Sequence, residues 1–166
     1  MEKRICFKRF VLEEDFSYFL KLTTNEELMV MNYGRIFTRE ESEGFYKKMM
    51  EQNSRTKDFG YFKVFKKNED TFIGLAAISV NNDCTEVEIE YLLLPEYWGN
   101  RYGTEIAENL LEKIKKISNI SKVTAIINPD NIRSKKILLK NGFILCKTYK
   151  VDDGKTAQMF IKELHN

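Results

Sequence analysis

The sequence predicts an α+β fold, with a mixed, mostly antiparallel central sheet of about seven strands and helices on both faces. The first third of the chain has mainly the apolar spacing of helices. Residues 60–94 instead have the alternation and short turns of an antiparallel meander. A later strand, helix and strand, residues 86–128, have the length of a crossover unit, which makes those two strands parallel.

The N-terminal third begins with one strand and continues as helices. Residues 5–10 (ICFKRF) alternate apolar and polar side chains, and residues 11–24 then have one apolar helical face. Residues 24–33 predict a second, short helix. Thr38 opens a third helix, which runs to residue 52, because it begins the capping box Thr-Arg-Glu-Glu.

The rest of the chain supplies most of the sheet. Three strands joined by short turns are predicted at residues 61–65, 71–80 and 86–94. An amphipathic helix from Tyr102 to Ile117 leads into a strand at residues 122–128. The predicted C-terminal elements are a short helix at 134–140, capped by Asn131 and ended by Asn141-Gly142, and strands at 143–151 and 156–164 around the turn signal Asp152-Asp153-Gly154.

Composition indicates one globular domain spanning residues 1–166. Apolar residues make up 43% and charged residues 31% of the chain, and 27 basic against 25 acidic residues give a net charge of +2. This balance predicts neither nucleic acid nor a membrane as a partner. Because the first ten residues lack the apolar core of a signal peptide, we expect a cytoplasmic protein, either a monomer or a homodimer.

The cysteine and histidine content limits the chemistry that the chain can perform. Cys6, Cys84 and Cys146 lie far apart with no CxxC pair, which favours free thiols over disulfides or a zinc site. The only histidine is His165, so triads and metal clusters that depend on histidine are excluded, and we expect no metal. Acid–base chemistry therefore falls to Glu, Asp, Tyr, Cys, Ser or water.

Residues 95–105 (PEYWGNRYGTE) pass from a turn into the amphipathic helix, and they predict an anion site. A helix N-terminus has unpaired N–H groups and a partial positive charge, which suits phosphate. Gly99 and Gly103 have no side chain to keep an anion from that backbone. No GKS or GKT follows, so this is not a P-loop. A surface turn whose glycines serve only the backbone, or a nucleotide-binding domain, would have the same pattern.

A second motif, residues 128–143 (NPDNIRSKKILLKNGF), makes the pattern more specific. Together the two motifs resemble the GNAT acyl-CoA-dependent N-acetyltransferases, and most of all the branch of Rim-type ribosomal-protein N-terminal acetyltransferases. The resemblance implies acetyl-CoA as cosubstrate and a sheet splayed between its two central parallel strands. It implies that the cofactor is bound by main-chain groups of Leu92, Leu93 and Leu94, by the turn residues Gly99, Asn100, Arg101, Tyr102, Gly103 and Thr104, and by Asn131 and Ser134.

This chain departs from the family pattern at two positions. The family motif has the form Gln/Arg-x-x-Gly-x-Gly/Ala, and here Trp98 takes the first place and Arg101 stands where glycine is usual. Either the Arg101 amide lies further from the pyrophosphate, or its guanidinium compensates with a charge-assisted hydrogen bond. Many members carry a tyrosine in the last helix as general acid, and the matching position here is Leu138.

Acetyl transfer needs a neutral amine and a proton for the leaving thiolate. Glu86, Glu88 and Glu90 alternate along one strand and so share one face, with Tyr91 on the other. Glu88 or Glu90 is the candidate base, although a solvated strand face would have the same pattern. Ser134 is the candidate for protonating the thiolate or holding a water, although it is equally suited to bonding the helix backbone. Asn131 is equally suited to a purely capping role.

The leading hypothesis is an acetyl-CoA-dependent N-acetyltransferase that acts by direct attack of the acceptor in a ternary complex. The acceptor is a primary amine, either a protein N-terminus or a small-molecule amine. A non-catalytic acyl-CoA-binding or sensing module is the alternative, suggested by Arg101 and by the absence of the tyrosine at Leu138.

Overall fold

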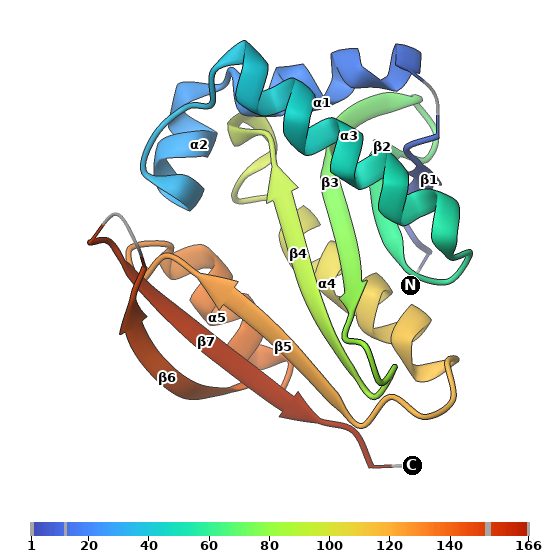
Figure 1. Ribbon diagram of the computed structural model, residues 1–166, viewed down its shortest axis with the longest axis vertical. Coiled ribbons are helices and arrows are strands. Elements are labelled where there is room, and N and C mark those ends of the chain that lie inside the picture. Colours follow the sequence, from blue (N-terminus) through green and yellow to red (C-terminus); the bar gives the residue numbers. More distant parts are fainter. Residues whose placement is uncertain (1, 12, 152–153, 166) are drawn as a thin grey trace.

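The computed structural model describes residues 2–11, 13–151 and 154–165. Its centre is one seven-stranded sheet in the order β1-β2-β3-β4-β5-β7-β6, in which only the β4–β5 pair is parallel (Figure 1). The strands are β1 Ile5–Arg9, β2 Gly60–Lys66, β3 Thr71–Val80, β4 Glu86–Leu93, β5 Lys122–Ile127, β6 Ile144–Lys150 and β7 Thr156–Glu163. The predicted mixed α+β architecture is therefore confirmed.

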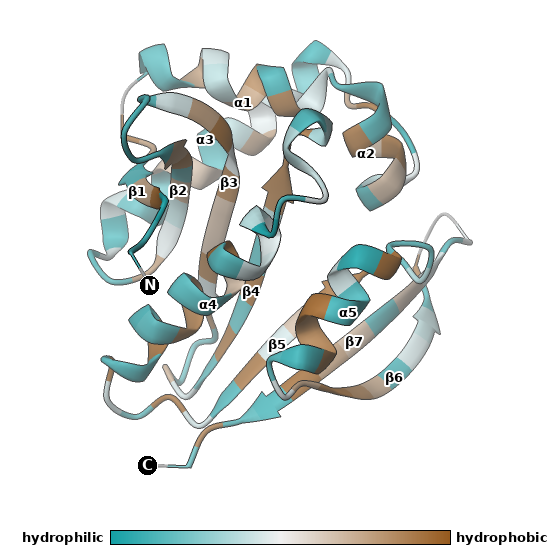
Figure 2. Cartoon of the chain, turned by 180° about the vertical axis from the view of Figure 1, so that it is seen from behind, coloured by the Kyte–Doolittle hydropathy of each residue, from teal (hydrophilic) through white to brown (hydrophobic). Residues whose placement is uncertain are grey.

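Helices cover both faces of this sheet. The α-helices are α1 Phe16–Thr23, α2 Glu26–Tyr33, α3 Arg39–Arg55, α4 Tyr102–Lys115 and α5 Ile132–Lys140, and short 3-10 turns lie at Glu13–Asp15 and Pro95–Tyr97. The helices α1 and α3 lie over one face and α4 and α5 over the other, as the views from the front and from behind show (Figures 1 and 2). The outward side of α4 is largely hydrophilic (Figure 2).

The local signals identified the helix ends to within a few residues. Thr38 makes both hydrogen bonds of its capping box with Glu41, and the Asn131 side chain caps α5 by accepting from the Ser134 N–H at 3.2 Å. The predicted first helix begins later than expected, since a 3-10 turn precedes Phe16. Of the predicted turn between β6 and β7, Asp152 and Asp153 lie outside the described residues.

Each face of the sheet has its own apolar core. On the α4 and α5 side, Ile106, Leu110 and Ile114 of the predicted helical stripe are fully buried against the strands. On the α1 and α3 side, a second core is rich in aromatic rings and includes Phe10 and Phe19. Among the described residues, no helix is long and apolar enough to cross a membrane.

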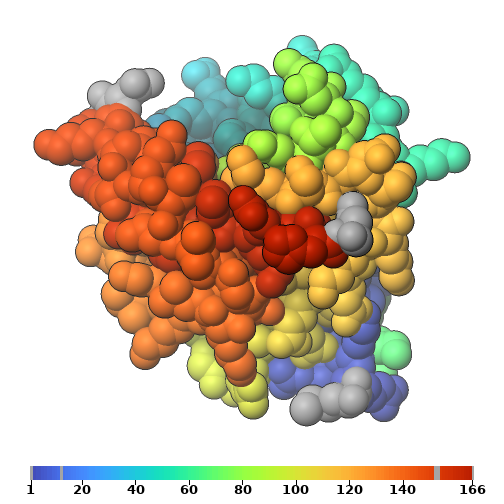
Figure 3. Space-filling model, turned by 90° about the horizontal axis from the view of Figure 1, so that it is seen from below, coloured from blue at the N-terminus to red at the C-terminus, as the bar shows by residue number. Residues whose placement is uncertain are grey.

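The two halves of the sheet are joined at one end only. The Ser121 N–H donates to the Thr85 carbonyl, and the Leu164 N–H donates to the Ser121 carbonyl, both at 2.8 Å. Seen from below, the red C-terminal residues lie directly against the gold segment between α4 and β5 (Figure 3). This end therefore holds β4 and β5 together, and the opposite end is where they can separate.

A close approach of β3 to β4 explains why residue 74 is a glycine. A Cβ at this position in β3 would lie 2.1 Å from the Leu92 carbonyl oxygen of β4, a contact that only backbone movement could relieve. We expect Gly74→Ala to lower the free energy of unfolding by about 1–3 kcal/mol, the usual cost of overpacking, in urea denaturation.

Gly44→Ala is the matched control for this prediction. Gly44 lies inside α3, and an added Cβ there would have no neighbour within 4 Å. Because alanine favours helix over glycine, this variant should gain about 0.5–1 kcal/mol. Equal effects of the two substitutions would show that the approach of β3 to β4 is not tight.

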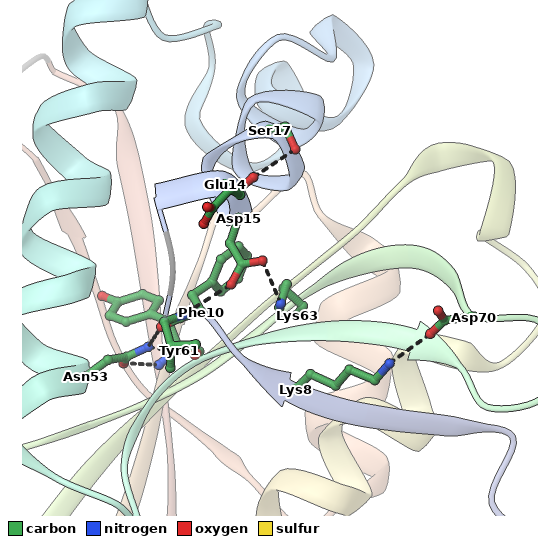
Figure 4. A network of polar contacts seen from close by, with 10 residues as sticks. Lys8, Phe10, Glu14, Asp15, Ser17, Asn53, Tyr61, Lys63 and Asp70 are labelled. Carbon is green, nitrogen blue, oxygen red and sulfur yellow. Dashed lines mark hydrogen bonds and ion pairs between the residues drawn. The ribbon is translucent and has the colours of Figure 1, made fainter.

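A buried ion pair fixes the 3-10 turn at the start of α1 to strand β2 (Figure 4). Lys63, in the middle of β2, donates to Asp15 at 2.8 Å, and the two side chains are only 11% and 8% exposed. The Lys63 ammonium also lies 5.5 Å from the centre of the Tyr18 ring and 5.9 Å from that of Phe65. The Asp15 carboxylate and the faces of the two rings thus replace the water that the Lys63 ammonium loses on burial.

Candidate functional site

The strands β4 and β5 separate part-way along their length. They pair only at Glu86–Lys122, Val87–Val123 and Glu88–Thr124, and they diverge beyond this point (Figure 1). From Ile89 onward, β4 is hydrogen-bonded to β3 alone. From Ala125 onward, β5 is hydrogen-bonded to β7 alone. The main chain of β4 therefore has an open edge, and the splay predicted between the central parallel strands is confirmed.

A rigid turn lies at the open end of β4. The Trp98 indole N–H donates to the Leu93 carbonyl at 2.7 Å, and the Arg4 guanidinium donates to the Asn100 carbonyl at 3.0 Å. Gly99 and Arg101 both have a left-handed backbone, with φ of +78° and +67°. Arg101 thus occupies a conformation that glycine adopts more easily, and it does so at the N-cap of α4.

The turn presents a series of unpaired amides. Among the described residues, no N–H group from Gly99 to Thr104 donates a hydrogen bond. The first amide of α4 that donates is that of Glu105, which bonds to the Arg101 carbonyl. A Cβ at Gly103 would lie 3.0 Å from Ile137 of α5, so this glycine also permits close helix packing. The mouth of α4 therefore has the donors that an anion needs.

A cleft of about 280 Å³ extends from this turn to α5, and we call it the turn-side cleft. The predicted residues that line it are Leu93, Gly99, Arg101, Tyr102, Gly103, Thr104, Asn131 and Ser134. Leu92, Leu94 and Asn100 do not line it. Sequence reasoning missed two basic residues of the same wall, Arg133 and Lys136; the run Arg133-Ser134-Lys135-Lys136 at the start of α5 was the available signal.

A second cleft of about 390 Å³ lies on the other side of the splay, and we call it the carboxylate-side cleft. It contains Glu88 and Glu90 from β4, which thus lie together as their alternation predicted. Asn32, Tyr91 and Ser134 line both clefts. The two clefts therefore meet in the gap between β4 and β5.

Helix α2 crosses the open end of the splay. The Asn131 side-chain amide donates to the Asn32 side chain at 3.2 Å, and the Lys155 ammonium donates to the Tyr33 carbonyl at 3.1 Å. These contacts join a helix of the N-terminal third to both α5 and the β6–β7 connection. Sequence reasoning gave α2 no role, because no local motif indicates partners this far along the chain.

The two carboxyl groups of the carboxylate-side cleft have different surroundings. Glu90 is partly buried and accepts a hydrogen bond from the Tyr33 hydroxyl. Burial raises the pKa of Glu90, and this hydrogen bond opposes the shift. Glu88 keeps contact with solvent and has no ion-pair partner among the described residues. Partial burial and the nearby Glu90 charge raise the pKa of Glu88.

Tyr91 lies where the two clefts join. Its ring packs against the core on the α4 and α5 side, the side opposite the carboxylates, as the alternation predicted. Its hydroxyl is buried without a well-formed hydrogen bond among the described residues, although Ser134 lies close enough to interact with it. Burial raises the pKa of Tyr91 to about 12, and Ser134 opposes that shift.

Comparison with known proteins identifies the family. The model of the acetyltransferase (GNAT) domain matches residues 4–144 of this chain. The chain belongs to the GNAT family of N-acetyltransferases. As a GNAT N-acetyltransferase it uses acetyl-CoA. A nucleotide-binding domain would have left the second motif without a role.

A curated relative is similar to this GNAT protein in sequence, and solved structures of other proteins are similar to it in fold. The uncharacterized N-acetyltransferase YnaD of Bacillus subtilis is 26% identical over 140 residues, which cover 84% of this chain and 79% of YnaD. The ribosomal-protein-S5-alanine acetyltransferase of Vibrio fischeri is 17% identical, with a TM-score of 0.78 over 98% of this chain and 94% of that one. A spermidine N-acetyltransferase of Vibrio cholerae, solved with CoA and spermine, is 15% identical, with a TM-score of 0.77 over 98% and 96%.

Neither a disulfide nor a metal site is found among the described residues of this GNAT protein. Cys6, Cys84 and Cys146 are free thiols, as predicted. Within residues 2–11, 13–151 and 154–165, no group of three His, Cys, Asp or Glu side chains is close enough to hold a metal ion.

Proposed function

We propose that this protein transfers the acetyl group of acetyl-CoA to a primary amine, with the cosubstrate in the turn-side cleft and the amine in the carboxylate-side cleft. The observation that carries the proposal is the meeting of these clefts at the open edge of β4. Bound there, the two substrates would react directly in one ternary complex. We further propose that residues 1–166 act as one domain.

The turn suits a pyrophosphate. Its unpaired amides from Gly99 to Thr104 supply donors, and Arg101, Arg133 and Lys136 add positive charge to the same cleft. The pantetheine arm would follow the open edge of β4. The Leu94 N–H is already paired with the Ile73 carbonyl, and main-chain groups alternate between the two edges of a strand. The Leu93 N–H therefore points toward the open edge, where the Leu93 carbonyl already accepts from Trp98.

Arg101→Gly tests the compensating guanidinium. Glycine adopts the left-handed backbone of residue 101 without strain, so we expect the variant to fold at least as well as the wild type. If the side chain contacts phosphate, CoA affinity measured by calorimetry should fall by about tenfold, the size of one exposed charge-assisted bond, and depend less steeply on salt. Unchanged affinity and salt dependence would remove Arg101 from the pyrophosphate site.

For the acceptor side, we propose Glu88 as the base that removes a proton from the attacking amine. It is accessible, it lacks an ion-pair partner among the described residues, and its raised pKa makes it a better base. The Glu90 carboxylate already accepts a hydrogen bond from the Tyr33 hydroxyl, so it is less suited to take the proton. Its proposed role is to raise the pKa of Glu88 through its charge. A neighbouring acidic pair also favours binding of a cationic amine.

The acceptor itself is a protein N-terminus or a small-molecule amine. An α-amino group with an ordinary pKa near 8 is neutral about a tenth of the time at pH 7, and a lysine or polyamine much less. The Rim-type resemblance of the two motifs favours the N-terminus. An assay of thiol release from acetyl-CoA should respond to amines in a panel of peptides, polyamines and aminoglycosides. Absence of amine-dependent release across the panel would overturn the proposal.

A further inference from the structure

The tyrosine that the family resemblance implies as general acid is missing from α5. Leu138, the position at which a tyrosine would be expected by resemblance, is fully buried in the core on the α4 and α5 side. Ser134 is the hydroxyl that both clefts share on α5. A serine hydroxyl does not titrate in the ordinary pH range, so it passes a proton on only if another group resupplies it.

The second shared hydroxyl is that of Tyr91. It comes from β4, beyond the last residue paired with β5, and like Ser134 it lines both clefts. A buried hydroxyl without a well-formed hydrogen bond is costly and is seldom retained without a use. Tyr91 therefore adds to this junction an acidic proton that Ser134 alone lacks.

We propose that Tyr91 is the proton source for the leaving thiolate and acts through the hydroxyl of Ser134. This inference rests on the proposed acetyl transfer. In that reaction the amine nitrogen bonds to the acetyl carbon, the carbon–sulfur bond breaks, and its electron pair stays on sulfur. The Ser134 hydroxyl gives its proton to sulfur and takes one from Tyr91. Glu88 takes the proton lost by the amine, and exchange with water restores Tyr91 and Glu88.

The surroundings of Tyr91 suit a donor that must remain protonated. With its pKa raised by burial, the phenol stays neutral at every pH at which the protein would be assayed. Asn131 accepts from the Ser134 N–H and thereby fixes the start of α5 beside the phenol. The Ser134 hydroxyl itself remains free to face either Tyr91 or the turn-side cleft.

The test compares Tyr91→Phe, Ser134→Ala and the double variant in the full-length protein, by thiol release and urea unfolding. We expect Tyr91→Phe to lower kcat about a hundredfold with the acetyl-CoA KM unchanged. The double variant should be no slower than the slower single variant, because the two hydroxyls act in series. Replacing Tyr91 with 3-fluorotyrosine, which keeps the phenol, should restore most of kcat.

Urea unfolding separates this role from a structural one. Tyr91→Phe removes a poorly bonded hydroxyl and changes no packing, so its midpoint should equal or exceed that of the wild type. Tyr18→Phe, on α1 and outside both clefts, should leave kcat unchanged. A lower midpoint for Tyr91→Phe, a kcat near that of the wild type, or losses that multiply in the double variant would each overturn the inference. Thiol release by the wild type would still support the proposed function.

Discussion

Replacing Glu88 with glutamine is expected to lower kcat at least a hundredfold, the usual contribution of a general base, without weakening acetyl-CoA binding. Glutamine keeps the shape of the side chain but cannot take a proton from the amine. Because Glu88 lies in the carboxylate-side cleft and not in the turn-side cleft, the acetyl-CoA dissociation constant should not change. Steady-state kinetics and calorimetry measure the two quantities separately.

The pH profile gives this prediction a direction. A base must be deprotonated, so kcat falls as the pH drops through the pKa of Glu88 in the complex. Burial and the Glu90 charge raise that pKa above the ordinary value of 4.5, so the acidic limb of the wild type should lie above pH 4.5. Glu88→Gln should abolish the limb, whereas Glu90→Gln, which removes the neighbouring charge, should move it to lower pH.

Glu86 offers a matched control on the same strand face. It pairs with Lys122 at 2.9 Å, and it lines neither cleft. Glu86→Gln should therefore leave both kcat and its acidic limb unchanged. Wild-type profiles in both Glu88→Gln and Glu90→Gln would show that neither carboxylate takes part in proton removal.

The largest effect on stability is expected at the buried pair of Lys63 and Asp15. Either Lys63→Met or Asp15→Asn leaves the partner's charge buried without its counterion, which costs about 3–5 kcal/mol of unfolding free energy. The double variant removes both charges and should recover much of that loss, since a buried pair gains little over apolar or neutral groups of similar shape. Urea denaturation of the four proteins gives the coupling energy directly.

The contact between Lys8 and Asp70 is the control for burial. Its distance is also 2.8 Å, and it lies beside the buried pair in Figure 4, but its side chains are 50% and 78% exposed. Solvent screens such a pair, so Lys8→Met should hardly change the unfolding midpoint. If the pair is coupled, the losses of unfolding free energy in Lys63→Met and Asp15→Asn do not simply add in the double variant. Additive losses, or losses no larger than that of Lys8→Met, would show that the ion pair does not hold the 3-10 turn before α1 to the sheet.

The sequence predicted what depends on local pattern. The alternation of residues 86–94 identified both faces of β4, and the side chains of Thr38 and Asn131 cap their helices as expected. Periodicity also predicted the apolar stripe of α4, because burial against a sheet imposes the helical period directly on the residues. The splay was predicted by resemblance and not by periodicity.

The sequence could not predict contacts between distant segments. Lys63 lies within an otherwise ordinary strand pattern, and its burial depends on Asp15, 48 positions away. The contacts of Tyr33 with Glu90 and of Asn32 with Asn131 join positions 57 and 99 residues apart. Tyr91 was assigned to the correct face, yet alternation alone does not show where that face opens into a cleft.

Amide chemical shifts during titration with CoA test the central claim most directly. If CoA lies along the open edge of β4 and on the turn, the largest shifts will fall at Leu93 and at Gly99–Thr104, with smaller ones at Asn131 and Ser134. The amides of β2, which pair with β1 and β3 away from the splay, will hardly move. Shifts concentrated elsewhere, with the amides of Gly99–Thr104 unchanged at saturation, would contradict this site.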